Sequence, residues 1–406
     1  MSILFIGSGP HNLTALTFLL QGRPELKGEV RVLDPSGAWL KRWNAQMRAQ
    51  EIVHLRSSSV HHPDPDPLAL RRFAKGRYDE FYPPYFLPGT ELFGQFCADV
   101  IDRFDVGSLP EEARVLRLEA REGRLTAHLS GTEDCAQGVL SPRHVVVSLG
   151  GGERRYPEFY QKWLEGSGAF RLAGETPPLL HSEEVDLTEL GEGVGRTVLI
   201  VGAGLTAGHL ALGALKRGWK VALLARRRIT YKLFDSAPGW IGPKHLAGFL
   251  REKRWERRRR MIAKARGGGA MTEELRQQLA PFLAGGQLKL KPRCEVRSLS
   301  VVDDRWRADC GWGRFLLADQ VWMCTGSKLD LKTHPLFRDL WKTHPLQLYD
   351  GLPVLDSGCR WPGLPLYLLG LPAGLSVGPT ARNFPGARKA ASLVAEAIGG
   401  VRVGPT

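Results

Sequence analysis

The sequence predicts an α/β protein with two Rossmann-like dinucleotide-binding domains. An apolar run, two glycines one residue apart and a helical leucine pattern occupy residues 3–20, and the same order returns at residues 198–217. A strand that leads through a glycine-rich turn into a helix opens a dinucleotide-binding unit. One such match is weak, but two in one chain are much more specific.

Composition limits the alternatives. The chain has 406 residues, enough for two domains, and its 43% apolar and 24% charged shares are those of a globular protein. It contains no apolar run of the roughly 18 residues that a membrane span needs, and no basic leader precedes its first apolar residues. The six cysteines form no C-x-x-C pair, so we expect no dithiol centre and no zinc site, in a reduced, cytoplasmic setting.

The first unit begins with the strand Ile3 to Ile6. Gly7 then permits a tight turn, and Gly9 lets a pyrophosphate approach the start of the following helix. Asn12 replaces the third glycine of the usual fingerprint, so we expect it to make a polar contact that glycine cannot make. The next strand ends in Asp34, at the position where an acidic residue binds a ribose hydroxyl.

A proline-rich loop follows at residues 56–67. Its histidines and aspartates could be read as metal ligands: His61, His62, Asp64 and Asp66. Alternate prolines hold the segment extended and adjacent histidines point apart, so we expect a turn-capping loop near the active site and no metal.

The second unit carries Gly202, Gly204 and Thr206 in a G-x-G-x-x-A pattern after the strand Val198 to Val201. The strand after its helix ends in arginines, with Arg226 and Arg227 where NAD-binding proteins usually have an acid. A guanidinium there can bind a 2′-phosphate, which predicts NADPH rather than NADH. The alternative is that these arginines form only a solvent-exposed basic edge and bind no phosphate.

The net charge of +14 is concentrated at residues 251–266, which hold nine basic and two acidic residues. Such a helix can bind nucleic acid or anionic lipid, which would make the protein a sensor or scaffold. Only Trp255 is available for stacking, so we expect no nucleic-acid partner and favour an exposed helix that steers the anionic cofactor.

Together these motifs resemble the two-dinucleotide flavoproteins, specifically the class B flavin-dependent monooxygenases, and most closely the lysine/ornithine N-hydroxylase group. The segment Gly7-Ser8-Gly9-Pro10-His11-Asn12-Leu13 matches that group's G-x-G-P-x-N-L, which adds Pro10 and Leu13 to the expected cofactor contacts. Val321 to Gly326 is similar to the A-T-G strand, and the turn around Gly378 is similar to the segment that closes over the flavin.

The resemblance implies an FAD domain of residues 1–150 and 320–406, an inserted NADPH domain of residues 195–319 and a crossover linker at residues 151–194. It also implies the activity. NADPH would reduce FAD, oxygen would add to the reduced flavin, and the flavin hydroperoxide would hydroxylate a soft nucleophile, with a primary amine as the expected substrate. The partners would be a small amine and molecular oxygen. The oligomeric state, including a homo-oligomer, is left open by the sequence.

The chain also departs from these families. The Baeyer–Villiger signature is absent, Cys324 replaces the alanine of A-T-G, and Gly370-Leu371 stands where many flavoproteins have Gly-Asp. No catalytic acid or base can be identified, although Gln50, His54 and His61 lie in a region that could face the flavin. An NADPH oxidase or reductase that transfers no oxygen to a substrate is the alternative with the same cofactors.

Overall fold

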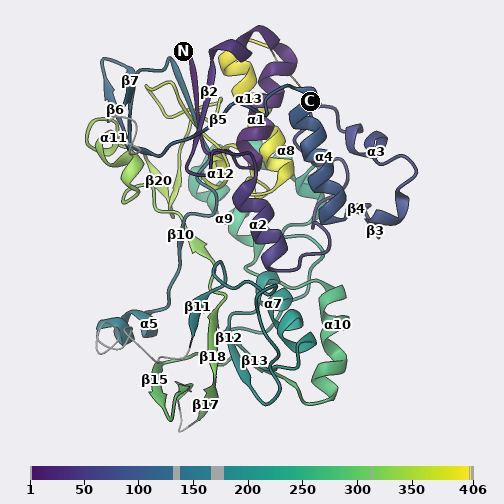
Figure 1. Cartoon of the computed structure of the whole chain (residues 1–406). Coiled ribbons are helices and arrows are strands. Elements are labelled where there is room, and N and C mark those ends of the chain that lie inside the picture. Colours follow the sequence, from purple (N-terminus) through teal and green to yellow (C-terminus); the bar gives the residue numbers. More distant parts are fainter. Residues whose placement is uncertain (1, 131–137, 166–177, 312–313, 402, 404–406) are drawn as a thin grey trace.

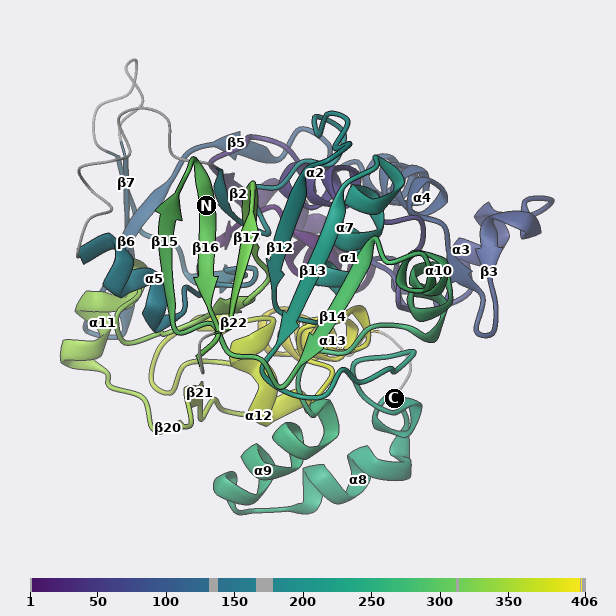
Figure 2. The ribbon, with the colours of Figure 1, turned by 90° about the horizontal axis from the view of Figure 1, so that it is seen from below.

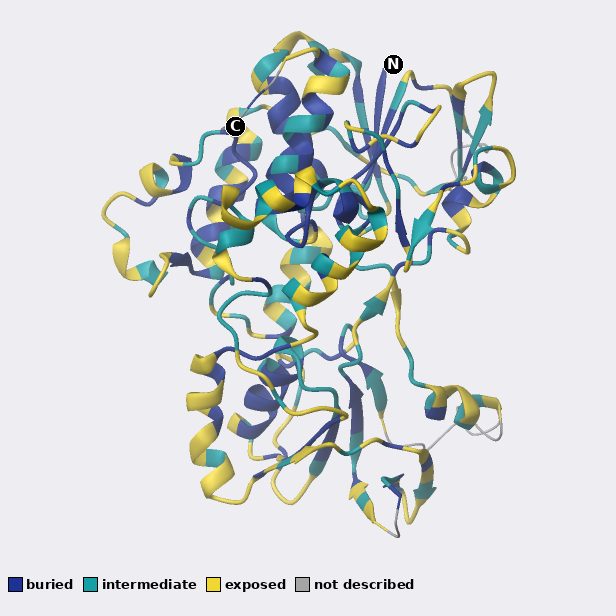
Figure 3. Ribbon diagram, turned by 180° about the vertical axis from the view of Figure 1, so that it is seen from behind, coloured by how far each residue is buried: buried dark blue, intermediate teal, exposed yellow. Residues whose placement is uncertain are grey.

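The computed structural model describes residues 2–130, 138–165, 178–311, 314–401 and 403. Two five-stranded sheets, each entirely parallel, form the centres of an upper and a lower lobe (Figure 1). Buried residues line the strands of both sheets, and exposed residues cover the outer helices (Figure 3). The chain therefore has the mixed α/β fold that the sequence predicts.

The first sheet has the order β22-β9-β1-β2-β5. Its strands are β1 (Ile3–Ile6), β2 (Val30–Asp34), β5 (Pro110–Glu112), β9 (His144–Val147) and β22 (Leu366–Leu368). The helices of this lobe are α1 (Pro10–Gly22), α2 (Lys41–Ala49), α3 (Ala69–Phe73), α4 (Thr90–Arg103), α11 (Arg338–Thr343), α12 (Gly374–Val377) and α13 (Phe384–Gly399).

The second sheet has the order β11-β18-β12-β13-β14. Its strands are β11 (Leu179–His181), β12 (Thr197–Val201), β13 (Lys220–Ala225), β14 (Leu288–Pro292) and β18 (Gln320–Met323). The helices α7 (Leu205–Lys216) and α10 (Glu273–Ala284) pack against it, and the antiparallel sheet β15 (Ser298–Val302), β16 (Arg305–Asp309) and β17 (Phe315–Ala318) lies beside it. In each sheet the strand that leads into the glycine turn is central.

The remaining elements are short or lie between the sheets. They are the helix α5 (Glu158–Trp163), the hairpins β3 (Phe81–Tyr82) with β4 (Leu87–Pro88) and β20 (Leu348–Tyr349) with β21 (Leu352–Pro353), and the antiparallel group β6 (Val115–Arg121), β7 (Arg124–Leu129) and β8 (Val139–Leu140). At the waist between the lobes, β10 (Glu153–Arg154) pairs with β19 (Ser327–Lys328).

The second unit is larger than the expected residues 195–319. Strand β11 lies inside the expected crossover linker 151–194, part of which falls outside the described residues, and β18 lies beyond residue 319. Both strands pair within the second sheet. Three residues in a glycine- and proline-rich stretch show too little periodicity to reveal β11, and β18 resembles any buried strand until its neighbours are known.

Two helices of the second unit lie against the first. Helices α8 (Pro243–Arg251) and α9 (Trp255–Arg266) project together beneath α12 (Figure 2). Phe249 and Ile262 form a small core with Leu352 and Leu375 of the first unit. The chain between residues 238 and 266 therefore connects the two lobes by packing as well as covalently.

Candidate functional site: two glycine turns

The first glycine turn, residues 7–9, is open on the side that matters for a ligand. Gly7 has a φ of +96°, and a Cβ atom there would lie 2.7 Å from the carbonyl oxygen of Ser148, so only glycine fits. A Cβ atom on Gly9 would meet no atom within 4 Å. Gly9 is the N-cap of α1, so this open space lies at the start of a helix whose first N–H groups lack intrahelical partners.

Asn12 holds this turn together from within. Its Nδ2 donates hydrogen bonds to the carbonyl oxygens of Ile6 at 2.8 Å and Gly7 at 2.7 Å. The polar contact expected of Asn12 is therefore made to the backbone of the turn. Pro10 is the first residue of α1, and Leu13 is fully buried in the core. Among the described residues, the Oδ1 atom of Asn12 is buried without a hydrogen-bond partner.

Asp34 lies at the end of β2 beside this turn. Its Oδ2 accepts a hydrogen bond from the N–H of Ser8 at 3.0 Å, and its Oδ1 accepts from the N–H of Ser36 at 2.8 Å and the Ser36 hydroxyl at 2.6 Å. Burial raises the pKa of Asp34, but these hydrogen bonds outweigh it and lower the pKa below its ordinary value. Asp34 is thus an ionised carboxylate that fixes the turn, and it remains only partly buried.

The second glycine turn, residues 202–204, has the same backbone design. Gly202 has a φ of +128°, and a Cβ atom there would lie 2.2 Å from the carbonyl oxygen of Cys324. Gly204 is the N-cap of α7, and Thr206 is the second, partly exposed residue of that helix. Unlike Gly9, Gly204 is covered: the Cα atom of Gly269 lies 3.8 Å from the position of a Cβ on Gly204.

The covering loop, residues 267–269, is anchored on both sides. Before it, the Lys232 ammonium donates to the carbonyl oxygen of Arg266 at 3.1 Å. After it, the N–H of Met271 donates to the carbonyl oxygen of Thr230 at 3.0 Å, and the N–H of Lys232 donates to the carbonyl oxygen of Met271 at 2.8 Å. These contacts hold the loop over the second turn.

The arginines after β13 lie beside this loop. Arg227 is exposed, and its Nη1 lies 3.7 Å from the position of a Cβ on Gly268. Arg226 is also exposed, with an Nη1 4.0 Å from a carboxylate oxygen of Glu295. An ion pair this long between exposed side chains contributes little, so both guanidinium groups are available to an anion.

A partly buried ionic network at the junction of the lobes was not predicted from the sequence. The Arg56 Nη1 lies 3.2 Å from one oxygen of Asp235, and the Arg266 Nη2 lies 3.0 Å from the other. Arg266 also donates to the carbonyl oxygen of Pro379 at 2.9 Å and to Asn383 Oδ1 at 3.3 Å. Burial raises the pKa of Asp235, but the two guanidinium groups outweigh it and lower that pKa. Residues so far apart in sequence leave no local signal.

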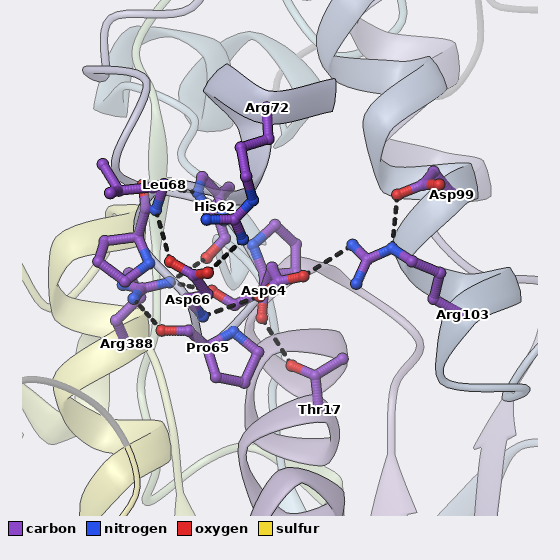
Figure 4. Close-up of polar contacts among 12 residues, drawn as sticks. Thr17, His62, Asp64, Pro65, Asp66, Leu68, Arg72, Asp99, Arg103 and Arg388 are labelled. Atoms are coloured by element: carbon purple, nitrogen blue, oxygen red, sulfur yellow. Dashed lines mark hydrogen bonds and ion pairs between the residues drawn. The ribbon is translucent and has the colours of Figure 1, made fainter. Parts of the chain in front are cut away.

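The aspartates of the loop 56–67 cap turns, as the sequence predicts, because Asp64 and Asp66 each accept the backbone N–H of the residue two positions later (Figure 4). Asp64 accepts from the N–H of Asp66 at 2.8 Å and from Arg103 at 2.7 Å, and Thr17 donates to the carbonyl oxygen of Pro63 at 2.6 Å. Arg388 of α13 donates to three carbonyl oxygens of the loop, those of His62, Asp64 and Pro65. Within the described ranges, no three histidine, cysteine or acidic side chains form a group that could hold a metal ion.

The polar residues expected near the flavin have protein partners. Gln50 is buried and donates to the carbonyl oxygen of Ser182 at 3.1 Å. His54 lies 2.7 Å from a carboxylate oxygen of Glu274. His61 lies 3.3 Å from the Ser57 hydroxyl, and burial lowers its pKa to about 4. These contacts are compatible with structural roles for all three.

Gly378 and the basic segment make contacts within the protein that the sequence did not predict. The side of Gly378 that would carry a Cβ faces Leu246 at 3.2 Å and Phe249 at 3.8 Å. The basic segment is divided between the end of α8 and α9, and Arg258 donates to the carbonyl oxygen of Leu375 at 2.9 Å. The segment is therefore partly structural, and not simply an exposed helix.

A cavity of about 980 Å³ lies between the lobes, where α2 and the start of α4 face α7 and α10. Arg56, His54 and Glu274 contribute to its lining, together with His209 of α7. Burial, together with the nearby His54 and Arg56, lowers the pKa of His209 to about 4, so this imidazole is neutral at pH 7. The size is that of a small-molecule site.

The described part of the chain contains free cysteines and no candidate membrane-spanning helix. Five cysteines are free, namely Cys97, Cys294, Cys310, Cys324 and Cys359, while Cys135 lies outside the described residues. Among those same residues, none of the helices combines the length and apolar character needed to cross a lipid bilayer.

Comparison with known proteins places the fold. No protein-family model matches the sequence, and no curated protein matches it either. Among solved structures, the FAD-bound cadaverine monooxygenase of desferrioxamine biosynthesis from Erwinia amylovora is similar over 100% of this chain and 95% of its own, with a TM-score of 0.77 and 16% identity.

Two amino-acid hydroxylases also have similar folds. The ornithine hydroxylase from Pseudomonas aeruginosa has a TM-score of 0.74 at 17% identity, and the L-lysine 6-monooxygenase from Pseudomonas syringae has 0.70 at 18%. Each comparison covers 98% of both chains. At these identities the likeness establishes the fold, and it is the fold of the group that the sequence motifs resemble.

Proposed function

We propose that the protein is an FAD- and NADPH-dependent monooxygenase that hydroxylates the nitrogen of a small amine. The observation that carries this proposal is the open first glycine turn, in a chain that shares its whole fold with three amine hydroxylases. The two parallel sheets would be two Rossmann-like domains, the first for FAD and the second for NADPH.

The residues of the first turn fit FAD. Gly9 leaves room for a diphosphate at the start of α1, whose first turn contains no acidic side chain. Asp34 is ionised and partly exposed at the position suited to a ribose hydroxyl, and the Oδ1 of Asn12 has no described partner. When bound, FAD supplies hydride acceptance and oxygen activation, while the chain supplies position and exclusion of water.

For NADPH, Gly202, Gly204 and Thr206 would line the second turn, and Arg226 and Arg227 would bind the 2′-phosphate. The loop 267–269 must then move, because Gly269 occupies the space beside Gly204. The cavity between the lobes would receive the amine. Its His209 is neutral, so it adds no positive charge that would repel a substrate ammonium.

The test is a turnover assay on the purified protein with FAD. Cadaverine, ornithine, lysine and shorter diamines are supplied with NADPH, and three quantities are measured: NADPH consumed, hydrogen peroxide released and the mass of each amine. We expect one amine to gain one oxygen atom in proportion to NADPH. If NADPH consumption equals peroxide release for every amine, the protein is instead the oxidase or reductase. If it binds no FAD, both functions are excluded.

A further inference from the structure

Helices α8 and α9 form a two-helix unit that projects from the body of the protein (Figure 2). Their inner faces share one small core, in which Leu246 and Phe249 of α8 and Ile262 of α9 pack with Leu375 of the first unit. Because both helices turn their apolar faces towards the same core, their opposite faces point away from the body into solvent.

Some basic residues of this unit are used inside the protein. Arg258 donates to the carbonyl oxygens of Glu252 at 2.7 Å and Leu250 at 2.8 Å, which joins the start of α9 to the end of α8. Arg266 belongs to the ionic network of Asp235. These guanidinium groups hold the unit together and fix it to its surroundings, so they are not available to a partner.

The other basic residues are exposed, and no ion pair reaches them from the part of the chain that the structure describes. On α8, Lys244 and Arg251 are seven positions apart, and on α9, Arg260 and Lys264 are four positions apart, so each pair lies on one face of its helix. The outer surface of the unit thus carries six free cations, namely Lys244, Arg251, Lys253, Arg254, Arg260 and Lys264.

Acidic residues on this surface do not cancel the charge. Glu252 lies 3.5 Å from Arg257, and Asp350, beside α9, lies 2.5 Å from Arg259, so both carboxylates already have a cationic neighbour. Glu256 is the remaining acid of residues 243–266. The outer surface is therefore strongly positive after its own ion pairs have been counted.

An exposed leucine lies beside these cations. Leu250 is 49% exposed at the end of α8, immediately before the basic connection 251–254. Trp255, at the start of α9, is partly buried, and the Arg258 guanidinium lies over its ring at 4.7 Å. A nucleic-acid base needs a free aromatic face for stacking, whereas a lipid surface combines anionic headgroups with an apolar layer beneath them. The surface therefore suits anionic lipid better than nucleic acid.

We propose that the outer face of α8 and α9 binds the anionic surface of a lipid bilayer, with Leu250 inserted between the headgroups. The cations supply attraction to the lipid phosphates, and Leu250 supplies burial of apolar surface. Because the unit projects, its outer face can meet a flat bilayer before the lobes do (Figure 2). This attachment is peripheral, and it does not depend on which dinucleotides the glycine turns bind.

The experiment measures binding of the full chain to vesicles by co-sedimentation at physiological ionic strength. Vesicles of phosphatidylglycerol and phosphatidylcholine in equal parts are compared with vesicles of phosphatidylcholine alone, and we expect binding to the first kind only. Neutralising three of the free cations should weaken this binding by about 100-fold, because each cation near an anionic surface contributes about fivefold. The triple variant is Lys253→Gln, Arg260→Gln and Lys264→Gln.

A matched triple variant removes the same charge elsewhere. Lys220, Lys289 and Lys291 are exposed lysines of β13 and β14, and replacing all three with glutamine should leave vesicle binding nearly unchanged. Leu250→Ser should weaken binding by about fivefold through the lost apolar contact. Its control is Leu283→Ser in α10, where the leucine is 46% exposed and binding should be unaffected.

Each outcome decides the proposal. No binding of the wild type to phosphatidylglycerol vesicles, or equal binding of the wild type and the first triple variant, would overturn it. Unchanged vesicle binding in Leu250→Ser would overturn the insertion of Leu250. Duplex DNA and polyglutamate are titrated in parallel, and tighter binding to either than to the vesicles would assign the surface to nucleic acid or to an acidic protein instead. Thermal melting of each variant checks that it is folded.

Discussion

The two glycine turns share one backbone design but differ in what lies above them. In both, the first glycine has a positive φ and lies against a carbonyl oxygen of the neighbouring strand's end, Ser148 for Gly7 and Cys324 for Gly202. Above Gly9 there is open space, whereas Gly204 lies against Gly269. The same sequence pattern therefore gives one turn that is ready for a ligand and one that requires a loop to move first.

The two turns also differ in charge. Asp34 follows β2 beside the first turn, and Arg226 and Arg227 follow β13 beside the second. A carboxylate accepts hydrogen bonds from ribose hydroxyls and repels a 2′-phosphate, whereas a guanidinium attracts it. The backbone thus sets where a dinucleotide lies, and the residue at the end of the next strand sets which dinucleotide is preferred.

Adding one methyl group to each turn should show most directly whether the two turns bind different dinucleotides. Gly9→Ala should fold normally, because its Cβ meets nothing within 4 Å, yet it fills the space that a diphosphate needs. We expect FAD affinity to fall by about 100-fold, or about 3 kcal/mol, with NADPH affinity unchanged. Gly204→Ala should do the reverse, since its Cβ has only an ordinary contact with Gly269. Separate FAD and NADPH titrations measure both effects.

The control is Gly94→Ala in α4, where a Cβ also meets no atom within 4 Å. This variant should bind both dinucleotides as the wild type does. Equal FAD affinity in Gly9→Ala and Gly94→Ala would show that the open space above Gly9 is not the diphosphate site.

Acid should destabilise the fold through the loop 56–67, which is bound by Thr17 of α1 and Arg388 of α13. His62 is fully buried, and burial together with Arg388 lowers its pKa to about 3. The imidazole is neutral in the fold but protonated in the unfolded chain below pH 6.5, so its contribution to stability decreases as the pH falls from 6.5 towards 3. At pH 5 the free energy of unfolding should be about 2 kcal/mol lower than at pH 8 because of His62 alone.

His62→Phe tests this linkage by denaturant unfolding at pH 8 and pH 5. The ring packs edge-on against Phe96 at 4.9 Å, so a phenyl group suits the site. We expect the loss of stability between pH 8 and pH 5 to be smaller in this variant, whereas His245→Phe at an exposed position should leave it unchanged. The same loss in His62→Phe and in the wild type would contradict the assignment.

These regions show what the sequence could predict. Both glycine turns have local signals, because a strand, a positive-φ glycine and a helix are adjacent in the chain. The cover over Gly204 and the partners of Asp235 have none, since they depend on residues 31 to 179 positions away. The loop 56–67 could be predicted as rigid from its prolines, but its anchor, Arg388, lies more than 300 residues later.

The charge difference between the turns gives the next smaller effect. Replacing Arg226 and Arg227 with glutamate should remove the guanidinium contacts to a 2′-phosphate and add repulsion. We expect the preference for NADPH over NADH to fall by about 10- to 100-fold, measured as the ratio of the two Kd values. Replacement of Arg228, the third arginine of the run, is the matched control. An unchanged ratio in the double variant would show that the 2′-phosphate binds elsewhere.

The smallest effect should come from the covering loop itself. A Cβ on Gly269 would lie 3.3 Å from the Cα of Gly204, which is closer than ordinary contact and involves backbone that cannot rotate away. Gly269→Ala should therefore destabilise the covered arrangement and increase the fraction of molecules with an accessible second turn. Since apparent affinity scales with that fraction, NADPH should bind about 2- to 5-fold more tightly.

Gly248→Ala in α8 is the control, because a Cβ there meets no atom within 4 Å. FAD affinity should be the same in both variants, since the first turn is not covered. Weaker NADPH binding in Gly269→Ala would mean that the loop contacts the bound dinucleotide instead of excluding it. The second turn would then differ from the first by having an additional wall, and the loop would close on NADPH instead of opening for it.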